Sequence, residues 1–585
     1  MPSYYLLLKW DYRNQNAKGN SDPTSCEFHG VHKQKVSNRK QQLYITTIVL
    51  LSPPSNYHPS IWDPQYIESL TSPYGDECFG TRLEELKFEA KRLLEATVEP
   101  LSWLELVDSI QLLGVAYHFE DEIKEGLDGV YGVGAHAGDL YTAALQFRLL
   151  RQHGYGVAPD IFNKFLEKER TFQACTSLDA KGLLSLYEAS HTMIHGEEVL
   201  EDAKEFSVKH LNCLMGNLQS NLREQVQHAL EMPLHWRMPR LEAKHYIDVN
   251  GRSDERNMVL LELARLDFNF VQSKHQEELK EVSRWWNDLG LAKKLEFSRD
   301  RLVENYLWAV GIAPEPQFSN CRKGLTKLMS ILTVIDDIYD LYGSLDELEL
   351  FTEAIKRWDI EALETLPEYM KICYLALFNF VHEVSYDTLK DYGWNILPLI
   401  REEWERLCMS YLAEAKWFGN GSKPALDEYL RNGWISVGGP VAMVHAYFLQ
   451  GRPIRKDSIN FLDHGSELIY WSSVATRLND DLGTSKAEMK RGDVPKAVEC
   501  HMIQTGVSHK DARKHIKGLV RDCWKKMNEE CLKCSLPNSY VETVLNMVRT
   551  AQCIYLHGDG IGTSTGVTQD RVISLICEPI PSQWP

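Results

Sequence analysis

Apolar residues recur every three to four positions along most of the chain from about Trp62 onward. The clearest examples are the ranges 104–113, 142–150, 259–270 and 369–381. This period is that of an amphipathic α-helix, whereas a half-buried strand would alternate apolar and polar residues. We see no convincing run of such alternation. The sequence therefore predicts an all-α fold.

Glycine and proline mark the predicted loops between these helices, at 154–159, 311–316, 419–424 and 451–453. A polar stretch at 248–256 separates two long helical halves, and a chain of 585 residues is long enough for two domains. We therefore expect an N-terminal domain at 51–255 and a C-terminal domain at 256–585. The segment 1–50 is polar and lacks periodicity, so we expect it to be poorly ordered.

Composition excludes several classes of partner. The net charge is −18, whereas a nucleic-acid-binding protein needs a basic surface. The longest apolar stretches, such as 43–51 and 374–381, fall short of the roughly 18 residues that a membrane-spanning helix requires. The 13 cysteines are scattered, and their odd number is typical of reduced thiols in an intracellular protein. In the first fifty residues, Lys and Arg outnumber Asp and Glu, so a transit peptide is one interpretation of that segment.

Two acidic clusters interrupt the apolar pattern, DDIYD at 336–340 and DDLGTSKAE at 480–488. Residues four apart on a helix share one face; those residues are Asp336 and Asp340 in the first cluster, and Asp480, Thr484 and Glu488 in the second. The flanking residues are apolar, so both acidic faces should point inward, where unpaired carboxylates are costly. We therefore expect a cation between them. A set of oxygen ligands suits Mg²⁺ or Mn²⁺ better than zinc and leaves coordination positions open for a phosphate.

Three arginines lie near these clusters. Arg299 and Arg301 belong to a short RDR segment, and Arg477 precedes Asp480 by three residues. A guanidinium at that spacing can reach the anion that the metals would hold, although a surface salt bridge is the alternative for each arginine. Trp308 follows Arg301 by seven residues, two turns along the same face. Its ring could stabilise a carbocation, and core packing is the alternative.

These motifs resemble those of the plant class I terpene synthases, in the angiosperm monoterpene synthase-like group. The matching text includes SRWWNDLGL, VIDDIYDLYGSLDELELFTEAIKRWD and LNDDLGTSKAEMKRGDVP, with YHPSIWD and LRQHGYGV in the first half. The resemblance thus covers nearly the whole chain from Tyr57. It implies an all-α protein with an N-terminal α-barrel-like scaffold domain and a C-terminal class I terpenoid synthase helical bundle. It also implies a prenyl diphosphate substrate and three Mg²⁺ ions, with Mn²⁺ as the alternative.

The resemblance assigns roles to individual residues. The expected metal ligands are Asp336, Asp340, Asp480, Thr484 and Glu488, with Asp337 in support. The residues expected to capture the diphosphate, to line the pocket or to close it are Arg299, Arg301, Arg477, Trp308, Tyr555 and Asp559. The same resemblance makes Arg299, Asp336, Asp340, Arg477 and Asp480 the groups around the substrate diphosphate. The run Ser436 to Pro440 (SVGGP) resembles a helix break whose backbone faces the substrate, and its glycines and proline would interrupt a helix on physical grounds too.

The function implied is the metal-dependent ionisation of geranyl diphosphate to a monoterpene and diphosphate. A sesquiterpene synthase acting on farnesyl diphosphate, an isoprene synthase and a non-catalytic prenyl-diphosphate-binding relative remain alternatives. A chain-elongating prenyltransferase fits less well, because that class resembles two DDxxD motifs. We find no DxDD acid for cyclisation started by protonation. We expect a monomer in the plastid, with the cytoplasm as the alternative.

The chain departs from cyclising relatives at one place before Trp62. A tandem arginine that such enzymes carry is replaced here by Ser52 and Pro53. In the family this pair is thought to help the N-terminal segment cap the site, so a looser cap is expected. Water would then reach the cation more easily, which predicts a larger share of acyclic or hydroxylated products.

Overall fold

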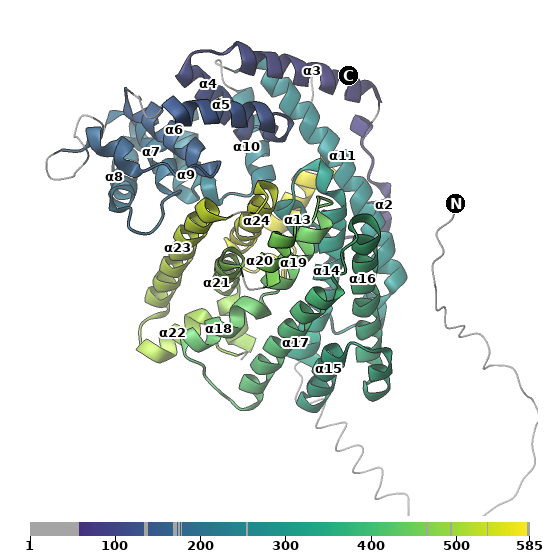
Figure 1. Cartoon of the computed structure of the whole chain (residues 1–585). Coiled ribbons are helices and arrows are strands. Elements are labelled where there is room, and N and C mark those ends of the chain that lie inside the picture. The colour runs from purple at the N-terminus through teal and green to yellow at the C-terminus, as the bar shows by residue number, and fades with distance from the viewer. Residues whose placement is uncertain are drawn as a thin grey trace, which may run out of the picture. The chain divides into compact units, whose positions relative to one another are not determined.

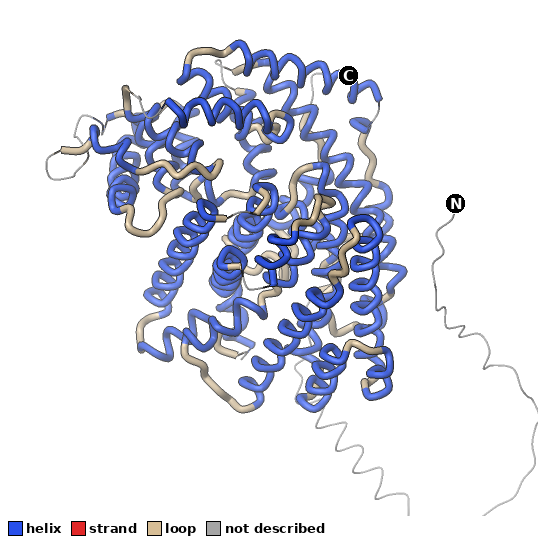
Figure 2. Tube along the Cα trace, in the orientation of Figure 1, coloured by secondary structure: helices blue, strands red, loops and turns tan. Residues whose placement is uncertain are grey.

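The computed structural model describes residues 58–581, except 76, 134–137, 168–171, 173–175, 177, 253–255, 464–465, 492–493 and 535. Within helices, no side chain is described at 77–78, 133, 460–461, 463 and 486–491. The described residues form helices joined by loops (Figures 1 and 2). Among them no strand occurs, apart from an isolated bridge between Leu166 and Phe172. The predicted all-α fold is confirmed.

The first half of the chain contains nine described α-helices: α2 (Pro64–Ser69), α3 (Glu77–Ala96), α4 (Pro100–Leu112), α5 (Glu120–Val133), α6 (Leu140–Gln152), α7 (Ala180–Ser190), α8 (Glu198–Leu214), α9 (Ser220–Glu231) and α10 (Pro239–Gly251). Short 3-10 turns among them are η1 (Pro73–Gly75), η2 (Ala116–His118), η3 (Pro159–Phe165), η5 (Met215–Asn217) and η6 (Leu234–Trp236).

The second half begins with the long helix α11 (Met258–Leu289) and continues with α12 (Leu291–Lys294), α13 (Leu302–Ile312), α14 (Ser319–Asp337), α15 (Leu345–Arg357), α16 (Glu368–Tyr392), α17 (Leu397–Gly419), α18 (Leu426–Ser436), α19 (Gly439–Leu449), α20 (Lys456–Asp463), α21 (Glu467–Arg491), α22 (Ala497–Thr505), α23 (His509–Lys533), α24 (Asn538–Tyr555) and α25 (Val567–Val572). Its short turns are η7 (Pro316–Phe318), η9 (Ile360–Thr365) and two π-helical turns, η8 (Ile338–Tyr342) and η10 (Ile573–Cys577).

Helix α11 starts where the sequence changes from polar to apolar. The side chain of Asn257 accepts a hydrogen bond from the backbone N–H of Leu260 and so caps the helix. Gly290 ends it in the left-handed conformation, at φ 71°, which a residue without a side chain adopts most easily. Helix α10 extends to Gly251, so the first four residues of the polar stretch 248–256 are helical, and α11 begins only after the stretch, at Met258.

The apolar core continues across the boundary that the sequence predicts between 255 and 256. One cluster of buried residues joins Leu86 and Leu104 of the first half to Leu260, Val310 and Leu575 of the second. The described residues accordingly belong to one compact unit, 55–585. The division into two domains at 255/256 stays a prediction.

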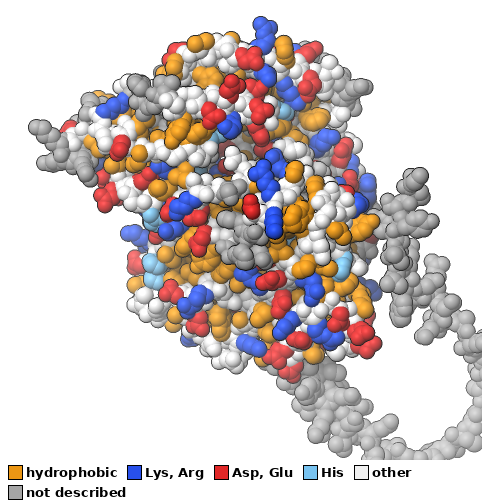
Figure 3. All heavy atoms as spheres, in the orientation of Figure 1, with side chains coloured by type: hydrophobic (Ala, Val, Ile, Leu, Met, Phe, Trp, Pro, Cys, Tyr) orange, Lys and Arg blue, Asp and Glu red, His pale blue; other side chains and the backbone are white. Residues whose placement is uncertain are grey.

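The two helices that carry the acidic clusters, α14 and α21, lie on either side of α19, which packs against both. Helix α24 packs against α21 and α13, and α13 packs against α14 (Figure 1). No helix of the described residues is long and apolar enough to cross a membrane. On the face shown in Figure 3, acidic and basic side chains alternate over the described surface without a continuous basic area.

Candidate active site

The first acidic cluster lies where α14 passes into the π-helical turn η8. Asp336 and Asp337 end α14, and Asp340 lies in η8. A π-helical turn is wider than an α-helical one and is frequent at functional sites. Asp336 is partly exposed and Asp340 is exposed, whereas Asp337 is buried. We call the end of α14 together with η8 the first wall.

The buried Asp337 has protein partners on the segment that precedes α13. It accepts hydrogen bonds from Ser298 Oγ at 3.1 Å and from the backbone N–H of Arg299 at 2.7 Å. The guanidinium of Arg299 spans both aspartates, with Nε 2.8 Å from Asp337 Oδ1 and Nη2 2.5 Å from Asp336 Oδ2. Burial raises the pKa of Asp337 to about 6, against the attraction of Arg299. Asp337 therefore holds the RDR segment against the first wall.

Asp336 and Asp340 lie close enough on this wall to repel each other when both are ionised. Although Asp340 as a whole residue is exposed, its carboxyl group is desolvated by the surrounding protein; this desolvation, and next the charge of Asp336, raise its pKa well above the usual value. Lys496 opposes this shift and Glu414 adds to it. Carboxylates that repel one another in this way favour a bound cation.

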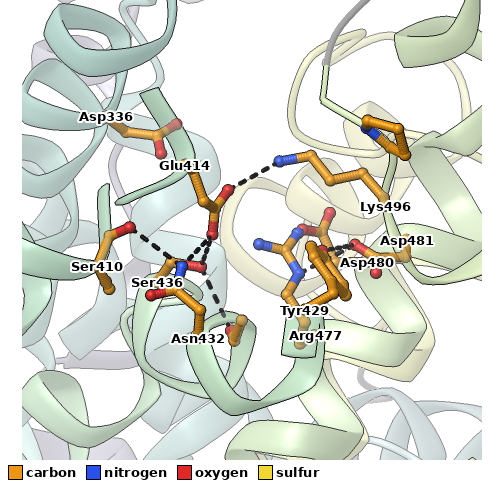
Figure 4. Close-up of polar contacts among 12 residues, drawn as sticks. Asp336, Ser410, Glu414, Tyr429, Asn432, Ser436, Arg477, Asp480, Asp481 and Lys496 are labelled. Carbon is orange, nitrogen blue, oxygen red and sulfur yellow. Dashed lines mark hydrogen bonds and ion pairs between the residues drawn. The ribbon is translucent and has the colours of Figure 1, made fainter. Parts of the chain in front are cut away.

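The second wall is the face of α21 that carries Arg477, Asp480 and Thr484. Arg477 forms an ion pair with Asp480, and its Nε lies 3.0 Å from Asp481 Oδ1. Asp481 is fully buried and also accepts hydrogen bonds from Tyr429 Oη and from the backbone N–H of Ala497, both at 3.0 Å. Thr484 is buried one turn farther along α21. Asp481 thus fixes the arginine while Asp480 stays at the wall (Figure 4).

The two walls follow the same plan. In each pair of adjacent aspartates, the first (Asp336 or Asp480) is partly accessible and the second (Asp337 or Asp481) is buried among backbone and side-chain donors. The structure therefore brings four predicted ligands, Asp336, Asp340, Asp480 and Thr484, onto two walls. Of Glu488 only the helical backbone is described. The metal-ligand roles stay predictions.

Arg301 has a different environment from the one expected. It is only 1% exposed, and its guanidinium donates to the backbone carbonyls of Asp300, His58, Ile561 and Gly562 at 2.8–3.1 Å. We call this set of contacts the Arg301 clasp. It joins the segment before α2 to the loop after α24, and its role in binding diphosphate stays a prediction.

Other predicted residues lie around the same loop. Asp559 accepts hydrogen bonds from the backbone N–H groups of Ile561 and Gly562 at 3.2 and 2.7 Å, so it shapes the loop that Arg301 contacts. The ring of Trp308 meets the ring of Tyr555 edge to face, with centroids 6.2 Å apart. These two aromatic residues are therefore neighbours, and their roles in lining and closing the pocket stay predictions.

Sequence reasoning missed two charged residues between the walls. Glu414 of α17 and Lys496, just before α22, form a buried ion pair with an Oε2 to Nζ distance of 3.2 Å. Figure 4 shows this pair between Asp336 on one side and Asp480 on the other. Neither residue belongs to a recognisable motif. The one signal for Glu414 is its place on the apolar face of α17, one turn after the buried Tyr411.

Comparison with known proteins identifies the family. The model of the terpene synthase N-terminal domain matches residues 61–230, and the model described as "Terpene synthase family, metal binding domain" matches residues 287–526. The predicted boundary at 255/256 lies between these ranges.

Two curated relatives match along most of their length. A chloroplastic trans-ocimene synthase of Litsea cubeba is 90% identical over 564 residues, which are 96% of this chain and 97% of the relative. A chloroplastic myrcene synthase of Quercus ilex is 49% identical over 535 residues, or 90% of this chain and 89% of the relative.

The fold of this chain also superposes on solved structures of terpene synthases. Limonene synthase with 2-fluorolinalyl diphosphate superposes with a TM-score of 0.88 at 41% identity, covering 91% of this chain and 100% of the other. Isoprene synthase of grey poplar, in complex with three Mg²⁺ ions and dimethylallyl-S-thiolodiphosphate, gives 0.81 at 42% identity, covering 89% and 99%. Together with the two acidic walls, these matches show that the chain belongs to the terpene synthase family and is a terpene synthase.

Proposed function

We propose that this enzyme ionises geranyl diphosphate and releases ocimene, an acyclic monoterpene, together with diphosphate. The observation that carries the proposal is the 90% identity to a trans-ocimene synthase over nearly the full length of both chains. The acyclic product agrees with the expectation from Ser52 and Pro53, which lie outside the described residues.

The residues present fit a set of divalent metal ions. The expected ligands carry only oxygen donors: Asp336 and Asp340 on the first wall, and Asp480, Thr484 and Glu488 on the second. Hard cations such as Mg²⁺ or Mn²⁺ prefer such donors, and the isoprene synthase complex contains three Mg²⁺ ions. When bound, these ions would neutralise the negative charge that develops on the leaving diphosphate. Asp337 is buried against Ser298 and Arg299, so we assign it a supporting role.

The reaction needs no protein nucleophile. The allylic C–O bond breaks, its electron pair leaves with the diphosphate, and a ten-carbon cation remains. We assign the capture of the departing anion to Arg299 and Arg477; the ion pairs that they form with Asp336 and Asp480, one at each wall, support this assignment. The cation then loses a proton from carbon to the diphosphate, and the C–H electron pair becomes the new double bond. The ring faces of Trp308 and Tyr555 would stabilise the cation before that step.

The test is incubation of the purified protein with geranyl, farnesyl or dimethylallyl diphosphate, followed by identification of the volatile products. We expect ocimene from geranyl diphosphate in the presence of Mg²⁺, no turnover in excess EDTA, and recovery when Mg²⁺ or Mn²⁺ is added back. Turnover of farnesyl or dimethylallyl diphosphate alone would favour a sesquiterpene or isoprene synthase instead. No turnover of any of the three would favour a non-catalytic relative.

We also propose a plastid location, because the relatives from Litsea cubeba and Quercus ilex are both named chloroplastic. The segment that would carry the transit peptide, 1–50, lies outside the described residues. A fluorescent fusion that carries residues 1–57 should enter chloroplasts, and a cytoplasmic signal would contradict the proposal.

A further inference from the structure

Glu414 lies between the two walls without belonging to either motif. It is 5% exposed, and both of its carboxylate oxygens have partners. Oε1 accepts hydrogen bonds from Ser436 Oγ at 2.5 Å and from Asn432 Nδ2 at 3.0 Å, while Oε2 lies 3.2 Å from Lys496 Nζ. One carboxylate therefore joins three segments, α17, the end of α18 and the residue that precedes α22 (Figure 4).

The contact with Ser436 fixes the break between α18 and α19. Gly438, at φ 76°, approaches the first wall so closely that a Cβ there would lie 2.6 Å from Leu332, one turn before Asp336. A Cβ on Gly439 would lie 2.3 Å from Ser473 Oγ, one turn before Arg477 on the second wall. The break is therefore a spacer that touches both walls. Its position relative to α17 is held by the hydrogen bonds that Glu414 accepts, together with the one that Asn432 donates to the Ser410 carbonyl at 3.0 Å.

The ion pair with Lys496 also connects Glu414 to the second wall, through the residue that follows Lys496. The residue after Lys496 is Ala497, whose backbone N–H donates to Asp481. Asp481 in turn lies 3.0 Å from Nε of Arg477. Glu414 is thus connected to the second wall both through the helix break and through the start of α22.

The charge of Glu414 is maintained in spite of its burial. Burial alone would raise the pKa of this carboxyl, but Lys496, Arg477 and the hydrogen bond from Ser436 outweigh burial and lower the pKa. Buried ion pairs add little to stability compared with apolar residues of similar volume. An ionised carboxylate at this place is therefore better explained by the geometry that it imposes than by the stability that it provides.

We propose that Glu414 is a positioning residue that fixes the separation of the two acidic walls, by holding the α18–α19 break and the Lys496 segment together. The inference rests on the proposed function, because that function gives the separation its purpose. Groups that orient metal ligands commonly change metal affinity or activity by about 10- to 100-fold when they are replaced. We expect an effect of that size from Glu414, although it touches neither metal nor substrate.

The experiment compares Glu414→Gln with Glu403→Gln. Both glutamates are buried on α17, but Glu403 pairs with Arg406, outside the contacts that join the walls. Binding of inorganic diphosphate in the presence of Mg²⁺ is measured by calorimetry, alongside thermal melting, kcat and KM for geranyl diphosphate. We expect Glu414→Gln to weaken binding about 10- to 100-fold. Glu403→Gln should bind as the wild type does. Glu414→Gln leaves the buried Lys496 without its ion-pair partner and should melt at a lower temperature, so binding is compared at a temperature where both variants are folded.

The outcomes separate the inference from the proposed function. If the wild type binds no diphosphate with Mg²⁺, the proposed function fails. If the wild type binds and Glu414→Gln binds equally well, or Glu403→Gln weakens binding as much, only the inference is overturned. Should Glu414→Gln not fold, Ser436→Ala decides, since it removes one hydrogen bond of the same arrangement. Weaker binding by that variant supports the inference, and unchanged binding overturns it.

Discussion

Adjacent aspartates in this enzyme have different surroundings, although the sequence presents them as equals. Helical spacing places Asp336 on the face of Asp340, but it does not show what Asp337 contacts one residue farther on. The difference arises from Ser298 and Arg299, which precede Asp337 by 39 and 38 residues and donate to it. Spacing therefore predicts which carboxylates share a face. It could not predict which of them accepts hydrogen bonds from a segment that is distant in the sequence.

This difference predicts that alanine at Asp336 mainly lowers the catalytic rate, whereas alanine at Asp337 mainly lowers the stability of the fold. Asp336→Ala should lower kcat on the order of a hundredfold or more, because a preorganised charge at the site is lost. The melting temperature should stay near that of the wild type. Asp337→Ala should instead destabilise the fold by about 1–3 kcal/mol, because it leaves partly buried donors of Ser298 and Arg299 without this acceptor. Steady-state kinetics and chemical denaturation of both proteins check this, and near-normal turnover by Asp336→Ala would place the metal site elsewhere.

At the scale of elements, the hydrophobic periodicity predicts the helices well. Of the irregular features, the sequence predicts the helix break at Ser436 to Pro440 but not the π-helical turn or the Arg301 clasp. The break at Ser436 to Pro440 was predicted because two glycines and a proline disfavour a helix. The π-helical turn after Asp337 was not predicted, because it depends on one extra residue in a turn whose composition is ordinary. The Arg301 clasp was also missed, since its acceptors are backbone carbonyls some 240–260 residues away, which leave no trace in the sequence.

The clasp predicts a local loosening when Arg301 is replaced. Arg301→Met removes donors to three carbonyls of distant segments, and a single charged hydrogen bond contributes about 1.5–3 kcal/mol. Amide hydrogen exchange around His58 and Ile561 should therefore speed up by about tenfold or more. The control is Arg284→Met, because Arg284 forms an exposed ion pair with Glu68 of α2, and such pairs contribute little. Equal exchange in Arg301→Met and wild type would show that the clasp does not hold these segments.

At the scale of the whole molecule, the two helical halves are tied together by buried polar contacts. Nε2 of His235, between α9 and α10, lies 2.8 Å from Asn528 Oδ1 on α23, and Arg549 of α24 donates to the His235 carbonyl at 2.9 Å. The rings of Trp236 and Trp524 stack with centroids 5.7 Å apart. The sequence predicts two halves from a polar stretch. It could not show this junction, because single histidine and asparagine residues occur in any helical protein.

Buried histidines predict how stability depends on pH. Burial lowers the pKa of His235 and of His445 to about 4, whereas an unfolded chain takes up the proton near pH 6.5. The stability that each neutral histidine contributes is therefore present above pH 6.5 and lost as the pH falls from 6.5 to about 4. The loss for each is up to about 1.4 kcal/mol per pH unit within that window.

Thermal melting between pH 7.5 and 4.5 checks this pH dependence. The slope below pH 6.5 should be smaller in His445→Gln than in the wild type, because one buried group no longer titrates. Identical slopes in His445→Gln and wild type would contradict the prediction.

The Arg301 clasp has a consequence for changing the product of this enzyme. Its acceptors are the main-chain carbonyls of His58, Ile561 and Gly562, so the contacts do not depend on which side chains those positions carry. Of the three positions, Ile561 is the one to vary, because His58 Nε2 itself bonds the Thr563 carbonyl at 2.6 Å and a Cβ on Gly562 would lie 2.1 Å from Asp559 Oδ2. A library that aims to change the product should therefore vary Ile561 and leave Arg301, His58 and Gly562 unchanged.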